Sequence, residues 1–253
     1  MNASLLTGKT IVVTRAVEQS RKLLSRLREE GAEAVSFPVI RITKANPVAS
    51  AEEIRREFDA YEWVVFTSVN GVRYFLEWLQ AVKLSLNNMK IAAVGRKTAE
   101  SLKRQGIYVD LIPERFEGRE LAALLKRKVT PGSRVLVPKG NLAKSTIKNT
   151  LAGKADVTEM IVYETKKNPV LDTRQLPAKV DMLLFMSPSS ISFFSETIGS
   201  RLADYQDVPA ACVGPVTAAK AKATGFRKLI TANDYTEEGI IKAVRIFFGK
   251  GKQ

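Results

Sequence analysis

Residues 64–79 read VVFTSVNGVRYFLEWL. A short apolar run is followed by a Thr-Ser pair and then by apolar side chains at helical spacing. Residues 183–194, LLFMSPSSISFF, repeat this pattern, and Ser187 occupies the place of Ser68. A short apolar run followed by a hydroxyl and an amphipathic segment is typical of a buried strand that turns into a capped helix. We therefore expect the same strand-turn-helix unit twice.

The similarity between the two halves continues without a gap over about 50 positions, always at an offset of 119 residues. The further matches are Val94 with Val213, Gly95 with Gly214, Thr98 with Thr217, Gly106 with Gly225 and Phe116 with Tyr235. A constant offset of this length indicates two copies of one structural unit.

Several more strands are expected around the first pair. The later apolar runs are KIAAVG (90–95) and VDLIP (109–113), matched by AACVG (210–214) and KLITA (228–232); a further pair is TIVVTRA (10–16) and SRVLVPKG (133–140). Short apolar strands that alternate with helical segments indicate parallel sheets covered on both faces. We predict an α/β fold of two similar, doubly wound parallel-sheet domains.

Two domain divisions fit this pattern. In the first, residues 1–36 plus 168–253 form a discontinuous domain and residues 43–160 an inserted one. Residues 37–42 and 161–167 would then be linker strands, with a cleft between the domains. The alternative is a tandem split near residue 128, and the sequence leaves both open.

The charge of the chain favours an anionic ligand. Lys and Arg number 40 against 26 Asp and Glu, which gives a formal net charge of +14, and such a surplus attracts anions. The basic residues are spread along the chain, without an arginine-rich arm, zinc-finger spacing or a recognition helix. We expect no nucleic-acid binding, so a small polycarboxylate is the better candidate.

Histidine is absent and Cys212 is the single cysteine, so neither an imidazole base nor a structural zinc site is expected. Cys212 lies in an apolar run and is expected to be buried. One cysteine also means no disulfide framework, which favours a cytoplasmic location. No apolar run approaches the roughly 20 residues of a membrane span.

The turns after the strands are the candidate binding site. Ligands of open α/β sheets bind beyond the carboxyl ends of the strands, where helix N-termini favour carboxylates and phosphates. The substrate-binding candidates at these turns are Thr67, Ser68, Asn70, Gly95, Ser187, Ser189 and Gly214, with Thr98 and Thr217 in the first turns of the helices that follow. Helix capping alone would also explain the serines.

The ordered motifs resemble those of the uroporphyrinogen-III synthase family across nearly the whole chain. They are VFTSVNGV, AAVGRKTAESL, PERFEGREL, RVLVPKGN, VYET, LFMSPSSISFF, CVGPVTAAKA and NDYTEEGI. The resemblance implies two α/β domains, one inserted in the other, joined by a two-stranded linker. It also implies a hydro-lyase of haem biosynthesis that closes hydroxymethylbilane, which carries eight carboxylates, to uroporphyrinogen III with loss of water and inversion of the fourth pyrrole ring.

The resemblance further implies that no metal or organic cofactor takes part, and we expect a monomer that contacts the upstream bilane-forming enzyme transiently. Tyr163 of VYET matches a tyrosine of the family and is the candidate proton donor, unless it is an aromatic that packs between the domains. Thr98 and Thr217 match family threonines that would contact carboxylates or the departing hydroxyl.

Arg15 and Lys139, at equivalent strand ends, are candidate cationic contacts or simply surface charge. The alternative function is that of a non-enzymatic two-domain binding protein for an anionic small molecule.

Overall fold

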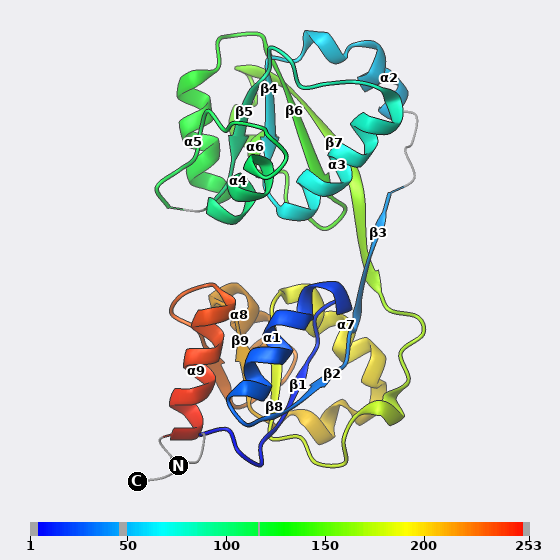
Figure 1. Ribbon diagram of the computed structural model, residues 1–253, viewed down its shortest axis with the longest axis vertical. Helices are drawn as coiled ribbons and strands as arrows, with labels where there is room; N and C mark the ends of the chain where they lie inside the picture. The colour runs from blue at the N-terminus through cyan, green and yellow to red at the C-terminus, as the bar shows by residue number, and fades with distance from the viewer. Residues whose placement is uncertain (1–4, 46–49, 116, 250–253) are drawn as a thin grey trace. The chain divides into compact units, whose positions relative to one another are not determined.

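The computed structural model describes residues 5–45, 50–115 and 117–249. The chain forms two compact units: unit 1, residues 1–41 and 166–253, and unit 2, residues 42–165. Each unit contains a five-stranded sheet with helices packed on it (Figure 1). The predicted α/β class with two mostly parallel sheets is confirmed. Phe116, which the repeat pairs with Tyr235, lies outside the described residues.

The unit 1 sheet is parallel throughout. Its strands in spatial order are β10 (Leu229–Thr231), β9 (Ala210–Cys212), β8 (Met182–Phe185), β1 (Thr10–Val13) and β2 (Glu33–Ser36). From β1 the chain first adds β2 on one side and then β8, β9 and β10 on the other. This is the doubly wound arrangement, and the direction of winding reverses between β1 and β8.

The unit 2 sheet repeats this order. Its strands are β3 (Ile40–Lys44), β7 (Ala155–Lys167), β6 (Ser133–Gly140), β4 (Trp63–Phe66) and β5 (Lys90–Ala93). The strands β7, β6, β4 and β5 run parallel and correspond to β2, β1, β8 and β9 of unit 1. The reversal of winding therefore falls between β6 and β4.

The strand β3 is the antiparallel edge of the unit 2 sheet. The amide of Ala45 donates to the carbonyl of Val162 (3.1 Å), and the amide of Asn168 donates to the carbonyl of Val39 (2.9 Å). One residue number rises as the other falls, which is the pattern of an antiparallel pair. The chain thus passes between the units along two paired segments, and the second of them is the end of the long strand β7.

The prediction of a strand at residues 109–113 is wrong. Within the described residues it is reduced to an isolated bridge between Ala92 and Leu111. The carboxylate of Asp110 accepts a hydrogen bond from the amide of Ile91 at 2.7 Å, which takes the amide that a strand at this edge would use. Pro113 has no N–H to continue a ladder.

Helices cover both faces of the unit 1 sheet (Figure 1). They are α1 (Val17–Glu29), α7 (Pro188–Ile198), α8 (Pro215–Ala223) and α9 (Glu237–Gly249). On one face, Leu23 of α1 and Ile240 of α9 belong to a buried cluster with strand residues such as Ile11. On the other, Phe194 of α7 packs edge-on against Phe185 at 5.6 Å. Strands that are buried on both sides explain the uninterrupted apolar runs of the sequence.

Unit 2 is built in the same way. Its helices are α2 (Ser50–Arg56), α3 (Val69–Val82), α4 (Arg96–Lys103), α5 (Gly118–Lys128) and α6 (Thr146–Leu151). Phe75 of α3 and Leu102 of α4 share one buried cluster, whereas Leu125 of α5 and Ile147 of α6 share another. No helix in the described part of the chain has the length and apolar content to cross a membrane.

Candidate active site

The points at which winding reverses carry most of the predicted site residues. In unit 1, Arg15 follows β1 and Ser187 follows β8; in unit 2, Ser68 follows β4 and Lys139 ends β6 with Gly140. Open α/β sheets bind ligands at such points, beyond the carboxyl ends of the strands. The topology thus places side by side, within each unit, residues that lie far apart in the sequence.

Ser68 caps the helix α3 and also contacts Tyr163. Its Oγ accepts a hydrogen bond from the amide of Gly71 at 2.9 Å, so the predicted cap is confirmed. The same Oγ lies 3.3 Å from the Oη of Tyr163, a distance at which either hydroxyl can donate. A helix cap and a functional contact are therefore compatible roles for this serine.

Tyr163 is held against its neighbours in unit 2. Its ring stacks on that of Tyr74 from α3, with centroids 5.8 Å apart and planes inclined by 24°. The hydroxyl end of the ring lies over the backbone of Gly140, where no side chain intervenes. The ring is half-buried, so it packs inside unit 2 and keeps part of its surface exposed.

Lys139 is neutralised within unit 2. Its Nζ donates to the carboxylate of Glu159 at 3.0 Å and to the Oγ of Ser145 at 3.2 Å, and that Oγ donates to the same carboxylate at 2.8 Å. The Lys139 side chain is only 7 % exposed. Lys139 is therefore not mere surface charge, one of the two alternatives expected from the sequence, while its contact with a ligand stays a prediction.

Ser187 repeats the role of Ser68 in unit 1. Its Oγ accepts from the amide of Ser190 at 3.2 Å and lies 3.0 Å from the Oγ of Ser189. Pro188 is the first residue of α7, where its missing N–H costs nothing. The hydroxyl of Thr14, at the end of β1, donates to the carbonyl of Leu184 at 2.8 Å and joins the two strands at the reversal point.

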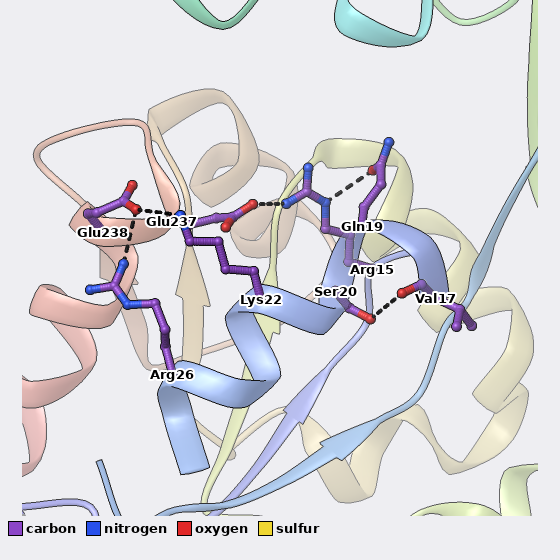
Figure 2. A network of polar contacts seen from close by, with 8 residues as sticks. All are labelled: Arg15, Val17, Gln19, Ser20, Lys22, Arg26, Glu237 and Glu238. Atoms are coloured by element: carbon purple, nitrogen blue, oxygen red, sulfur yellow. Dashed lines mark hydrogen bonds and ion pairs between the residues drawn. The ribbon is translucent and has the colours of Figure 1, made fainter. Parts of the chain in front are cut away.

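Arg15 belongs to an ion-pair network in unit 1 (Figure 2). It donates to Glu237 at 2.6 Å and to the side chain of Gln19 at 3.1 Å, and Figure 2 shows this contact reaching from the end of β1 to the start of α9. Arg26 lies 3.0 Å from Glu238 in the same network. The Arg15 side chain stays 24 % exposed, so it retains surface for a ligand.

Thr98 and Thr217 occupy matching places at two helix N-termini. Gly95 and Gly214 are the N-cap residues of α4 and α8, and each threonine is the third helical residue, as predicted. Both threonines are buried, yet no hydrogen bond joins either hydroxyl to a described residue. These hydroxyls thus remain available to a ligand at the positive end of each helix.

The remaining predicted residues lie beside these positions. Thr67 precedes the cap of α3 and Asn70 is the second residue of that helix, and both are half-buried. Sequence reasoning did not select Gly140, Tyr74 or Tyr235 as site residues. Tyr235 is 63 % exposed and packs over Gly214, where an added Cβ would lie 3.1 Å from its ring.

Cys212 is not suited to nucleophilic chemistry. It is fully buried in β9, and this burial raises the pKa of its thiol to about 12, so the thiolate is scarce at neutral pH. Within the described ranges, no three His, Cys, Asp or Glu side chains come together in a way that could hold a metal ion.

Comparisons with known proteins agree on one family. The family model for uroporphyrinogen-III synthase HemD matches residues 21–242. The uroporphyrinogen-III synthase of Chlorobaculum parvum is 29 % identical over 247 residues, which cover 93 % of this chain and 98 % of that protein. The porphyrin biosynthesis protein HemD of Ruminiclostridium josui is 29 % identical over 95 % of this chain, which spans only 49 % of that longer protein.

The fold of this chain is also similar to that of a solved structure. A crystal structure of a mutant uroporphyrinogen III synthase from Thermus thermophilus superposes with a TM-score of 0.67 at 18 % identity, and covers 96 % of this chain and 100 % of that one. The full-length sequence relatives assign the synthase activity, a hydro-lyase activity of tetrapyrrole biosynthesis. The chain therefore belongs to the uroporphyrinogen-III synthase family.

Proposed function

We propose that the chain converts hydroxymethylbilane to uroporphyrinogen III, and that Tyr163 gives a proton to the hydroxyl that leaves. The observation that carries this role is the placement of the Tyr163 hydroxyl 3.3 Å from Ser68, at the reversal point of the unit 2 sheet. A partly exposed tyrosine that is held against the end of β6 is suited to proton transfer to a bound substrate.

Carboxylate binding is assigned to the helix N-termini. The starts of α3 and α4 in unit 2, and separately those of α7 and α8 in unit 1, offer backbone N–H groups and helix dipoles that favour the carboxylates of the substrate. The unpaired hydroxyls of Thr98 and Thr217 and the exposed part of Arg15 would add hydrogen bonds. The net charge of +14 raises the local concentration of such a polyanion.

The proposed chemistry uses little from the protein beyond one proton and a fixed geometry. The C–O bond of the terminal hydroxymethyl group breaks with electrons from the pyrrole nitrogen, and the protonated hydroxyl leaves as water. The resulting azafulvene is attacked by the substituted carbon of the fourth ring, and the spiro intermediate reopens and closes with that ring inverted. Closure at the correct carbon depends on how the bilane is held, which is catalysis by positioning.

Some features of the proposal rest on the sequence alone. The monomeric state, the transient contact with the enzyme that supplies the bilane and the cytoplasmic location stay predictions. The supplier must form a linear tetrapyrrole that carries a free hydroxymethyl end, because this group provides the water that is lost.

The test is a product analysis. The purified chain is incubated with enzymatically generated hydroxymethylbilane, the products are oxidised, and porphyrin isomers I and III are separated by chromatography. We expect predominantly isomer III with wild-type protein and a much slower appearance of isomer III with Tyr163→Phe. Isomer I alone, at the rate without protein, would overturn the proposed substrate and product.

A further inference from the structure

We infer that Gly140 is a positioning residue for Tyr163: its missing side chain creates the space in which the tyrosine hydroxyl is held. This inference rests on the proposed role of Tyr163 as proton donor. It assigns a function to a glycine that lies 23 positions away in the sequence and contacts Tyr163 through the pairing of two strands.

The space beside Gly140 is fully taken up by the tyrosine ring. A Cβ added to Gly140 would lie 2.8 Å from the Oη of Tyr163 and even nearer to its Cζ. Cβ atoms in proteins hardly ever approach other heavy atoms within 3.0 Å. Alanine at this position would therefore force the ring to move, and the ring can do so because the atoms concerned are at the free end of a side chain.

The backbone of Gly140 does not itself require glycine. Its φ is not among the positive values that L-residues avoid. The register of β6 and β7 shifts between Lys139 and Gly140, so that Lys139 pairs with Ile161 and Gly140 with Tyr163. Space, and not backbone conformation, is thus the reason for glycine at this strand end.

Unit 1 supports this conclusion. The corresponding strand, TIVVTRA against SRVLVPKG, places Ala16 where unit 2 has Gly140. Ala16 is buried at 1 % exposure and its methyl group is accommodated. The repeated fold therefore tolerates a Cβ at this point, and glycine is specific to the unit that holds Tyr163.

Two further contacts limit where a displaced ring could go. Tyr74 stacks on the Tyr163 ring and is itself fixed, since it is 8 % exposed and its hydroxyl donates to the carbonyl of Ile42 at 3.4 Å. Ser68 meets the hydroxyl at 3.3 Å. A ring displaced by a methyl group at residue 140 would lose the Ser68 contact first, because that contact is near the limit of a hydrogen bond.

The experiment is a double-mutant cycle with Gly140→Ala, Tyr163→Ala and the double variant, each assayed for kcat, KM and the ratio of isomers III and I. We expect Gly140→Ala to lower kcat about 10- to 100-fold with little change in KM, the size expected for a small misplacement of a reacting group. In the Tyr163→Ala background the same change should have almost no effect, because the ring it displaces is gone. Gly118→Ala is the matched control, since a Cβ there meets nothing within 4 Å.

The outcomes distinguish a failure of the positioning role of Gly140 from a failure of the donor role of Tyr163. An unchanged kcat in Tyr163→Ala would overturn the donor role, whereas a lowered kcat there with wild-type kcat in Gly140→Ala would overturn only the positioning role. An equal loss in both backgrounds would show that Gly140 acts independently of the ring. Should Gly140→Ala fail to fold, rescue of folding by Tyr163→Ala supports the contact and no rescue contradicts it.

A spectroscopic readout completes the test. In protein labelled with 3-fluorotyrosine, the Tyr163 signal is identified among the six tyrosines by its loss in Tyr163→Phe. We expect Gly140→Ala to shift this signal and Gly118→Ala to leave it in place. An unmoved Tyr163 signal in Gly140→Ala would overturn the inference whatever the kinetics.

Discussion

The Oη of Tyr163 lies 3.3 Å from the Oγ of Ser68, and this serine is also the N-cap of α3. The hydroxyl of the candidate proton donor is therefore linked directly to the positive end of a helix. The Oγ of Ser68 can accept from the helix amide and still donate to the phenol oxygen, because a hydroxyl has one donor and two acceptor lone pairs. The Oγ of Ser68 thus both caps the helix α3 and contacts the hydroxyl of the proposed proton donor.

Tyr163→Phe should lower the rate of isomer III formation by about 10- to 100-fold without abolishing it. The loss of the donor removes the gain from general acid catalysis, while the binding and folding of the bilane remain. The measurement is kcat with hydroxymethylbilane as substrate. Tyr108→Phe is the matched control, because that ring is 87 % exposed and lies outside the proposed site. A wild-type rate in Tyr163→Phe would contradict the donor role.

Thr98→Val and Thr217→Val should each reduce kcat/KM by about 10-fold while the protein stays folded. Valine keeps the shape of the buried side chain and removes a hydroxyl that makes no hydrogen bond within the described structure, and a hydrogen bond to a charged group is worth about 1.5–3 kcal/mol. Because the proposed binding is distributed over several helix ends, neither change should eliminate activity. Total loss of turnover in a folded variant of either threonine would argue against distributed positioning.

Ser68→Ala and Ser187→Ala should each destabilise the protein by about 1 kcal/mol, because each removes an N-cap. Urea unfolding monitored by circular dichroism measures the change, and the exposed Ser200 provides a Ser→Ala control outside a cap. Ser68→Ala should reduce kcat in addition, through its contact with Tyr163. Equal stability of the two cap variants and Ser200→Ala would exclude the capping role.

Glu159→Gln should destabilise unit 2 by about 3 kcal/mol, because it leaves the ammonium of Lys139 nearly buried without a charged partner. Glu77→Gln is the matched control: it breaks an ion pair with Arg73 whose side chains are 60 % and 42 % exposed, and it should cost less than about 1 kcal/mol. Chemical unfolding of both variants gives the comparison. Similar small losses for the two would show that Lys139 gains enough hydration or finds another partner.

Cys212 should make stability fall at alkaline pH. Burial raises the pKa of its thiol from 9.0 to about 12, so between these values the unfolded chain has released a proton that the folded chain still holds. This contribution is intact below pH 9 and is lost as the pH rises towards 12. The difference in unfolding free energy between wild type and Cys212→Ala, measured from pH 8 to 11, should therefore shrink with pH. A difference that is independent of pH would contradict the raised pKa.

Local signals in the sequence account for much of the fold and for part of the site. Apolar runs such as residues 64–66 and 183–185 predict strands that are buried on both faces, and the hydroxyls of Ser68 and Ser187 mark the first turns of the helices that follow. Each signal lies within a few residues of the structure it predicts. The segment 109–113 resembles a strand by the same criterion, but the side chain of Asp110 binds the amide of Ile91, and the pairing is reduced to the isolated bridge between Ala92 and Leu111.

The contacts that complete the site depend on distant pairings. Arg15 is 222 positions from Glu237, and Lys139 finds Glu159 only because β6 and β7 are neighbours. The approach of Gly140 to Tyr163 follows from a register shift of one residue, which no local pattern encodes. The sequence can therefore select candidate side chains, but their partners are fixed by strand order and register.

Because the chain passes from unit 1 into unit 2 and back again, the two units are completed at different times during protein synthesis. When residue 165 has left the ribosome, unit 2 has all five of its strands, whereas the first 41 residues supply only β1 and β2 and still lack the three strands β8, β9 and β10. We expect the middle of the chain to fold first during translation, and the N-terminal segment to wait, with its apolar strands unpaired, for the last third of the protein. In the growing chain, the segment that carries β1 and β2 is therefore the one that most needs protection from aggregation.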